Sequence, residues 1–352
     1  MQGTIGYFHH QGCCQLPIDL KRVTDTLSNL GQSPNVGAAL IVSLGCEGTD
    51  HERMVEEIRA AGKPVEIIRI QELGGTSRAI QAGIDAAQRL VQEISGLQRE
   101  TVDISEVVMA IKCGASDTTS GMASNCVIGY VADKLVDLGA TVVFGETTEF
   151  LGGEHILAKR AVGGENGPIG QKIYEIVDRM EKRAKSVGED MRGGQPTPGN
   201  IAGGLSSIEE KSLGAIVKSG HRPIQGVLEY CDRVDGQKGL WIKDAPGREP
   251  EILTGMAATG AQFMMFSTGR GAPQGFPSMP VIKICGNPHT YERMQHDMDL
   301  NAGRIIQGEK TIEEVGEEAF RLMLDVLSGK MTKNEALGYY GSMDIFCLGP
   351  VI

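Results

Sequence analysis

The stretch that decides the fold is VVMAIKCGASDTTSG, residues 107–121. It opens with the apolar run Val107–Ile111, which is typical of a strand buried on both faces. Small and hydroxyl residues follow, and then a helical pattern begins. In open α/β sheets, ligands bind outside the carboxyl ends of the parallel strands. The stretch therefore predicts a buried parallel strand with a functional loop at its carboxyl end.

Strand and helix patterns alternate on both sides of this stretch. Alternating elements of this kind predict an α/β protein whose parallel strands are covered by helices. The polar residues 96–105 read as a linker, which divides the chain into domains of residues 1–102 and 103–352. We expect strands at 38–44, 65–70, 107–111, 141–144, 224–229, 240–243, 262–267 and 280–285. We expect helices at 50–61, 76–95, 120–138, 169–187, 207–218, 249–259 and 311–328.

The composition is that of a globular protein, with 352 residues, 41% hydrophobic and 22% charged. A formal net charge of -11 argues against a nucleic-acid or anionic-membrane partner. The first residues lack the features of a signal peptide, and no apolar run is long enough to span a membrane. The eight cysteines are expected to be thiols or ligands rather than a disulfide scaffold. We expect a cytoplasmic enzyme.

Two cysteines near the N-terminus also lie in loops beside apolar runs. Cys13 follows His9 and His10 in HHQGCC, and thiolate and imidazole ligands suit zinc or ferrous iron. The spacing is not that of a zinc finger, and an exposed thiol in a turn is the alternative. Cys46 ends the apolar run before SLGCEG, where the alternative is a small buried apolar side chain.

The loop after residue 111 has the chemistry of an anion site. Backbone N–H groups at the start of the following helix would favour a carboxylate near Cys113. The alternative for Ser116 and Asp117 is that they cap the helix.

A second acidic loop, GETTEFLGGEH at 145–155, also follows an apolar strand. It contains Glu146, Glu149, Glu154 and His155. Carboxylate and imidazole groups fit an open divalent metal site. The alternative is that these acidic residues only complement the dipole of a helix start.

Further polar candidates lie in the C-terminal half of the chain. Arg270 lies between glycines in STGRG, after an apolar strand, where its guanidinium can reach a carboxylate. The segment 191–206 is rich in glycine and proline, and loops of that length are usually functional. Asn200 in this segment, and the run Glu209–Lys211 after it, can supply hydrogen bonds or a base. Turn chemistry and a solvated helix face are the alternatives.

Several of these segments together resemble the altronate/galactarate dehydratase family. KCGASDTTSG, GETTEFLGGEH, GGQPTPGNIAGGLSSIEEKSLGAI and FSTGRGAPQG resemble its large C-terminal region, and HHQGCCQ, SLGCEG and IQELGGTSRAI resemble the domain before it. The resemblance runs from about Gly6 to the C-terminus and does not include the small SAF (β-clip) domain. It implies a smaller N-terminal α/β domain of a dimerising type, followed by a Rossmann-like variant with a mainly parallel sheet and a metal site.

The resemblance also implies an activity. Family members are iron-dependent hydro-lyases that dehydrate a sugar acid such as altronate or galactarate to a 2-keto-3-deoxy acid. Relatives include a sulfolactate sulfo-lyase, so the large subunit of such an enzyme is a second interpretation, and a non-catalytic subunit is a third. The implied partners are the small sugar-acid substrate, a second copy of the chain in a homodimer, and possibly a small SAF-domain subunit.

The expected site combines the residues with the resemblance. We rank a mononuclear Fe²⁺ above another divalent metal and above an iron–sulfur cluster held by three cysteines. The predicted metal ligands are Cys13, Cys46, Cys113, His9 and Glu146. The predicted catalytic residues are Lys211, His155 and Glu210, and the predicted substrate-binding residues are Arg270, Ser116, Asp117, Asn200 and Thr268.

Overall fold

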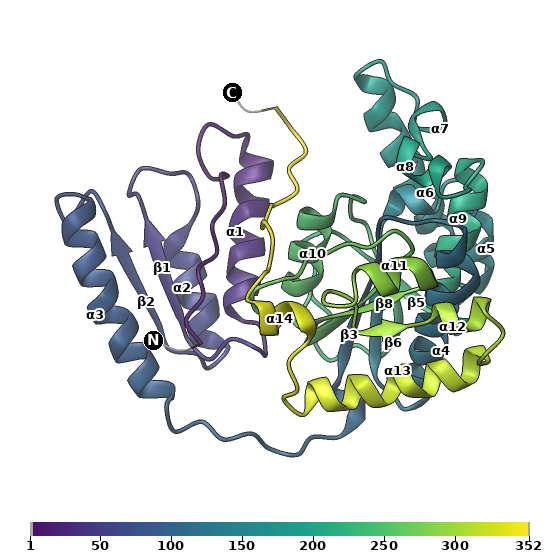
Figure 1. The fold of residues 1–352 in the computed structure, drawn as a ribbon. Helices are drawn as coiled ribbons and strands as arrows, with labels where there is room; N and C mark the ends of the chain where they lie inside the picture. Colours follow the sequence, from purple (N-terminus) through teal and green to yellow (C-terminus); the bar gives the residue numbers. More distant parts are fainter. Residues whose placement is uncertain (1–2, 351–352) are drawn as a thin grey trace.

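The computed structural model describes residues 3–350 as two α/β parts, shown in Figure 1. The N-terminal part contains two parallel strands, paired from Ala39↔Val65 to Ser43↔Arg69. Asp50 caps the second helix by accepting from the Arg53 N–H, as predicted. The elements are α1 (Pro17–Gly31), β1 (Ala39–Ser43), α2 (His51–Ala60), β2 (Val65–Arg69) and α3 (Thr76–Ile94). The helix α1 was not predicted.

The C-terminal part is built on a seven-stranded sheet in which every strand pair is parallel. The strand order is β5-β6-β4-β3-β7-β8-β9. This sheet, with helices on both faces, confirms the predicted fold class. The strands are β3 (Val108–Cys113), β4 (Thr141–Phe144), β5 (Ile224–Leu228), β6 (Gly239–Lys243), β7 (Phe263–Thr268), β8 (Val281–Cys285) and β9 (Leu300–Asn301).

The helices of this part connect and cover the strands. The predicted division at residue 102 falls between α3 and β3, in the coil that connects them at the bottom of Figure 1. The longer helices are α4 (Asn125–Asp137), α5 (Glu154–Arg160), α6 (Pro168–Ser186), α9 (Ile208–Ile216), α10 (Glu249–Ala258) and α13 (Ile312–Leu327). The short ones are η1 (Ile104–Glu106), η2 (Ser120–Ser124), η3 (Thr147–Glu149), α7 (Met191–Gly194), α8 (Pro198–Ala202), η4 (Val217–Ser219), α11 (Pro288–Arg293), α12 (Gly303–Ile306) and α14 (Lys333–Leu337).

The core lies on both faces of the seven-stranded sheet. Because side chains alternate along a strand, Met109 and Ile111 of β3 face the cluster formed with α4 and α13. Ala110 faces the opposite cluster, which includes residues of α10 and α1. A strand that is apolar on both faces is the pattern predicted for residues 107–111. No helix in residues 3–350 is long and apolar enough to cross a membrane.

The strand order reverses direction at β3. From β3 the chain moves to β4 on one side and later crosses back to β7 on the other side. A reversal of this kind opens a crevice between the carboxyl ends of the two strands, which is where open α/β sheets bind ligands. The loops after β3 and β7 therefore mark the expected place of a functional site.

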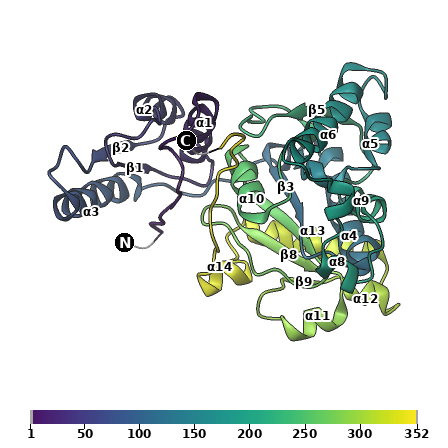
Figure 2. The same cartoon turned by 90° about the horizontal axis from the view of Figure 1, so that it is seen from above.

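The C-terminal segment ties the two parts together. Asp19 of α1 is buried and accepts the backbone N–H groups of Leu348 and Gly349 at 2.7 and 2.8 Å. Gln15 donates to the sulfur of Cys347 at 3.1 Å. Figures 1 and 2 show this yellow segment running beside α1. We refer to residues 339–350 as the C-terminal strap.

Candidate active site

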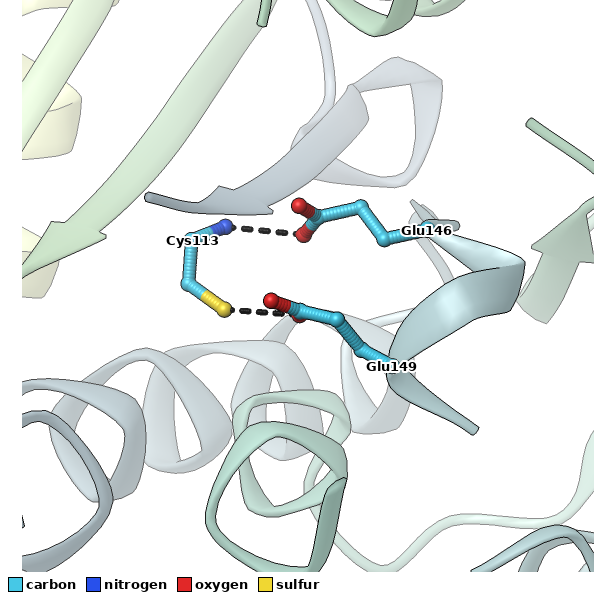
Figure 3. A group of neighbouring side chains, drawn as sticks. All are labelled: Cys113, Glu146 and Glu149. Carbon is cyan, nitrogen blue, oxygen red and sulfur yellow. Dashed lines mark hydrogen bonds between the residues drawn. The ribbon is translucent and has the colours of Figure 1, made fainter. Parts of the chain in front are cut away.

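Three polar side chains meet at the carboxyl ends of β3 and β4. Cys113 is the last residue of β3, and Glu146 and Glu149 follow β4 (Figure 3). The Cys113 N–H donates to Glu146 at 3.0 Å, and its thiol donates to Glu149 at 2.9 Å. All three are buried, and their candidate ligand atoms lie within 4.8 Å of one another. This group, the Cys113 group, offers donor types and spacing that could hold a metal ion.

Two lysines, Lys112 and Lys218, contact the side chains of the Cys113 group. Lys112 is hydrogen-bonded to Glu146 and donates to the carbonyl oxygens of Cys113 at 2.5 Å and Gly247 at 3.1 Å. Lys218, in η4, places its Nζ 2.9 Å from the Cys113 sulfur, 2.8 Å from Glu146 and 2.6 Å from Glu149. Two ammonium groups therefore stand against two carboxylates in a buried cluster.

The environment shifts the pKa values of the Cys113 group. Burial raises the pKa of the Cys113 thiol. Burial disfavours the ammonium of Lys218, but the neighbouring Cys113 and carboxylates outweigh it and raise the Lys218 pKa. Burial also works against the Glu149 carboxylate, yet Lys218 lowers its pKa to about 2. Burial and the charge of Glu149 raise the pKa of Glu146.

The backbone at Glu146 is strained. Its φ of 72° lies in the left-handed region, which a residue with a side chain rarely adopts. Such outliers persist only where the surroundings hold them, and they cluster at functional sites. Here the two lysines and the Cys113 N–H hold the carboxylate in place. The strain supports a functional role for this loop.

The loops after β3 and β7 lie next to each other at the end of β3, where Cys113 pairs with Ser267. Ala115, in the loop after β3, has a φ of 49°, and its carbonyl accepts the Arg270 N–H at 2.9 Å. The Arg270 side chain is exposed and forms no ion pair with any residue of the described part, 3–350. An unpaired guanidinium at a switch point is suited to binding an anion.

The other predicted substrate-binding residues hold the loops around Arg270 in place. Asp117 is buried and accepts from Ser120 N–H at 3.1 Å and from Asn287 at 3.0 Å, so the capping alternative is correct for it. Asn200 donates to the carbonyl of Ser116 at 2.9 Å. Thr268 is buried and accepts the N–H of Gly271 at 3.0 Å. These contacts join the loop after β3 to α8 and to the loop after β8, and Thr268 stabilises the turn after β7.

The three predicted catalytic residues lie in different surroundings. Lys211 of α9 is half-buried and donates to Gln195 at 2.9 Å, and its charge helps to lower the Glu149 pKa. Glu210 is exposed and accepts from Ser206. His155 is exposed near the start of α5. Of the three, Lys211 is the one whose charge reaches the Cys113 group.

The remaining predicted metal ligands lie in the N-terminal part. His9 and Cys13 precede α1, and Cys46 follows β1. The two loops are joined by the hydrogen bond from Gly48 N–H to the Gly12 carbonyl at 2.8 Å. Both cysteines are exposed. Within residues 3–350, the ligand atoms of these three side chains do not converge with one another or with Cys113 to within 4.8 Å.

Lys218 is the site residue that the sequence reasoning missed. The sequence predicts Lys218 only as the last residue of the helix at 207–218. The available signal was its position two helical turns after Lys211, which places both lysines on the same side of the helix. Lys112 stood in the quoted stretch and was given no role, because a lysine inside an apolar strand is ordinarily exposed.

The iron implied by the family resemblance would have to bind the sulfur and oxygen atoms of the Cys113 group. A metal ion binds sulfur and oxygen ligands at roughly 2.0–2.3 Å. Lys218 Nζ is already at hydrogen-bond distance from all three candidate ligand atoms. With Lys218 in place, the residues do not fit an iron ion.

Comparison with known proteins identifies the family. Residues 104–349 match the family model "D-galactarate/Altronate dehydratase, C-terminal", and residues 1–95 match "D-galactarate dehydratase/Altronate hydrolase, second domain". The chain is 38% identical to the (2R)-sulfolactate sulfo-lyase subunit beta of Chromohalobacter salexigens, over 96% of this chain and 86% of that protein.

Two dehydratases are also similar. The chain is 36% identical to galactarate dehydratase (L-threo-forming) of Escherichia coli, over 93% of this chain and 63% of that protein. It is 33% identical to altronate dehydratase of Bacillus subtilis, over 93% of this chain and 64% of that protein. The chain thus spans just under two thirds of these dehydratases. These relatives support the prediction of a carbon–oxygen lyase. The chain belongs to the galactarate/altronate dehydratase family.

Proposed function

We propose that the chain dehydrates a sugar acid such as altronate or galactarate to a 2-keto-3-deoxy acid. The observation that carries the proposal is the exposed Arg270 at the β3/β7 switch point, which forms no ion pair within residues 3–350 and follows the strand that pairs with Cys113. A sugar acid presents the carboxylate that such a guanidinium binds in a bidentate manner. Membership of the dehydratase family supports the same reaction.

The reaction is an elimination followed by a tautomerisation. A base removes the proton from C2, next to the carboxylate, and the C3 hydroxyl leaves as water once an acid has protonated it. The resulting enol takes up a proton at C3 and becomes the 2-keto acid. Stabilising the charge that develops on the carboxylate side is the largest catalytic requirement.

The residues around the crevice can meet these requirements. Arg270 binds the carboxylate and stabilises the charge that grows on it during proton removal. Lys211, acting as the neutral amine, is our candidate for the base, because it is half-buried and its side chain reaches Gln195 and the surroundings of Glu149. His155 and Glu210 stay alternative candidates. Ser116, Asp117, Asn200 and Thr268 hold the loops that shape the crevice.

The iron requirement implied by the family resemblance stays a prediction, and no step above depends on it. The predicted ligands His9, Cys13 and Cys46 lie in the loops of the N-terminal part. The localisation also stays a prediction, and we expect the protein to be cytoplasmic.

A second candidate is the elimination of sulfite from sulfolactate. One observation favours it: the chain is 38% identical to the sulfo-lyase subunit beta over 96% of its own length. The chemistry is closely related, since the same proton leaves and sulfite replaces water as the leaving group. A sulfonate would require a further cation in the crevice.

We also propose two protein partners. The N-terminal part exposes the apolar side chains Val42, Leu44, Ile80 and Ile84, which supports a homodimer formed through this part. A small SAF-domain subunit is the second expected partner, since the sulfo-lyase relative is named as one subunit of an enzyme. Light scattering of the purified chain, alone and with such a subunit, measures both associations.

The function is tested by turnover under anaerobic conditions with added Fe²⁺ and thiol. Altronate, galactarate and sulfolactate are supplied separately, and 2-keto acid and sulfite are both measured. Formation of a 2-keto-3-deoxy acid is the expected result. Sulfite release without dehydration would instead establish the second candidate. No turnover with or without an SAF-domain subunit would favour a non-catalytic chain.

A further inference from the structure

The Cys113 group contains a cation at the position where a metal ion would sit. Lys218 is fully buried and has three N–H bonds, the number that an ammonium group carries. Its three acceptors are the Cys113 sulfur, Glu146 Oε2 and Glu149 Oε2. These are one atom from each of the three side chains that could hold an ion. Lys218 therefore donates hydrogen bonds to the same three side chains that would bind a metal ion.

A metal ion and Lys218 cannot share this position. An ion bound to these atoms would lie within about 3 Å of the ammonium nitrogen, and two buried like charges at that distance repel strongly. Lys112 occupies the second oxygen of Glu146 and closes the other side of the group. Lys112 also donates to two backbone carbonyls, which anchors it at the end of β3. Lys112 is therefore held beside the group by contacts that do not involve Lys218.

We infer that Lys218 is the resident cation of the Cys113 group and takes the place of a metal ion there. Cys113 and Glu146, which the sequence predicted as metal ligands, are instead held by ammonium groups. Lys218 acts as a positioning residue, because it joins the ends of β3 and β4 through Cys113 and Glu149. Any ion that this chain binds is then held by other residues, among which His9, Cys13 and Cys46 are the predicted ones.

Cobalt(II) binding tests this inference, and it does so without any substrate. The full chain is titrated with Co²⁺ in anaerobic buffer, and the absorption from sulfur-to-cobalt charge transfer is recorded. We expect Cys113→Ser and the unmodified chain to bind the same amount of Co²⁺. The same result is obtained if neither protein binds Co²⁺. Cys126→Ser is the matched control, because Cys126 lies in α4 outside the group. A loss of about tenfold or more in Co²⁺ affinity in Cys113→Ser alone would overturn the inference.

A second variant tests the role of Lys218 itself. Lys218→Met removes the ammonium and leaves the three ligand atoms free, so it should gain a Co²⁺ ion with a sulfur charge-transfer band. The double variant Cys113→Ser/Lys218→Met should lack that band. Circular dichroism shows whether Lys218→Met is folded. If Lys218→Met is unfolded, the Co²⁺ titration of Cys113→Ser tests the inference by itself. A folded Lys218→Met chain that gains no Co²⁺ would contradict the role given to Lys218. Because this experiment measures metal binding, a result against the inference can be told apart from a lack of lyase activity.

Discussion

The Nζ of Lys218 lies 2.9 Å from the sulfur of Cys113, and both side chains are buried from solvent. This contact joins the end of β3 to the short helix η4, segments that are far apart in sequence. The acidic loop after β4 closes around the same ammonium group. The carboxyl ends of β3 and β4 are thus held together by buried charged side chains.

Replacing Lys218 by methionine should destabilise the fold. The change leaves Glu149 without its closest cation, and breaking a buried ion pair costs roughly 3–5 kcal/mol. Lys182→Met is the control, because Lys182 forms an exposed pair with Asp178 and should change stability by about 0.5 kcal/mol or less. Urea denaturation measures both. Equal losses in the two variants would show that the buried network contributes no special stability.

Replacing Arg270 by alanine should weaken substrate binding. A hydrogen bond to a charged group contributes about 1.5–3 kcal/mol, so KM should rise by roughly 10- to 100-fold. Since stability should be unaffected at this exposed position, the effect should appear in steady-state kinetics alone. Arg321→Ala, an exposed arginine of α13, serves as the control. An unchanged KM in Arg270→Ala would remove Arg270 from the substrate site.

Glu47 should give the chain an acid-sensitive stability. Burial opposes its charge, but the backbone N–H groups of Gly45 and Leu44 lower the Glu47 pKa to about 2. A carboxyl whose pKa is depressed on folding stabilises the folded state above its unfolded pKa of 4.5. That contribution is lost as the pH falls from about 4.5 towards 2.

The variant Glu47→Gln isolates this effect. It should be less stable than the unmodified chain at pH 7, and the difference should shrink as the pH approaches 2. Thermal melting at a series of pH values measures the difference. A difference that is constant across the acid range would mean that the Glu47 charge is not stabilised by the loop after β1.

Replacing Asp19 by alanine should release the C-terminal strap from α1. The backbone N–H groups of Leu348 and Gly349 would lose their buried acceptor, at a cost of about 1–3 kcal/mol. Amide hydrogen exchange should accelerate in the strap and not in β3. The exposed Asp85→Ala on α3 is the control. Unchanged exchange in residues 339–350 would mean that other contacts hold the strap.

Much of the fold was predictable from periodicity alone. The apolar run 107–111 is buried on both faces in the structure, as a strand inside a parallel sheet must be. The helix α1 was missed for a physical reason. Its buried face includes the polar residues Asp19, Thr24, Thr26, Ser28 and Asn29. These side chains make tertiary hydrogen bonds, and they mask the apolar positions Leu20, Val23, Leu27 and Leu30, which do recur at helical spacing in the sequence.

The candidate site was only partly predictable. Loops at the ends of β3, β4 and β7 follow from strand patterns, and the structure places Cys113 and Glu146 together. The segment 191–206 was expected as a loop and contains the short helices α7 and α8, with Thr197 and Asn200 forming a capping box. For Lys218 the sequence offers only its spacing from Lys211, and its contact with Cys113 depends on the path of the chain between β4 and β5.

The central claim is that this chain removes water from a sugar acid by taking the C2 proton. The most direct test is anaerobic incubation of the purified chain, with Fe²⁺ and any required SAF-domain subunit, with galactarate or altronate in deuterium oxide. We predict a 2-keto-3-deoxy acid that carries one deuterium at C3, because the enol takes its last proton from the solvent. If neither sugar acid is consumed while sulfolactate releases sulfite under the same conditions, the dehydration claim is wrong.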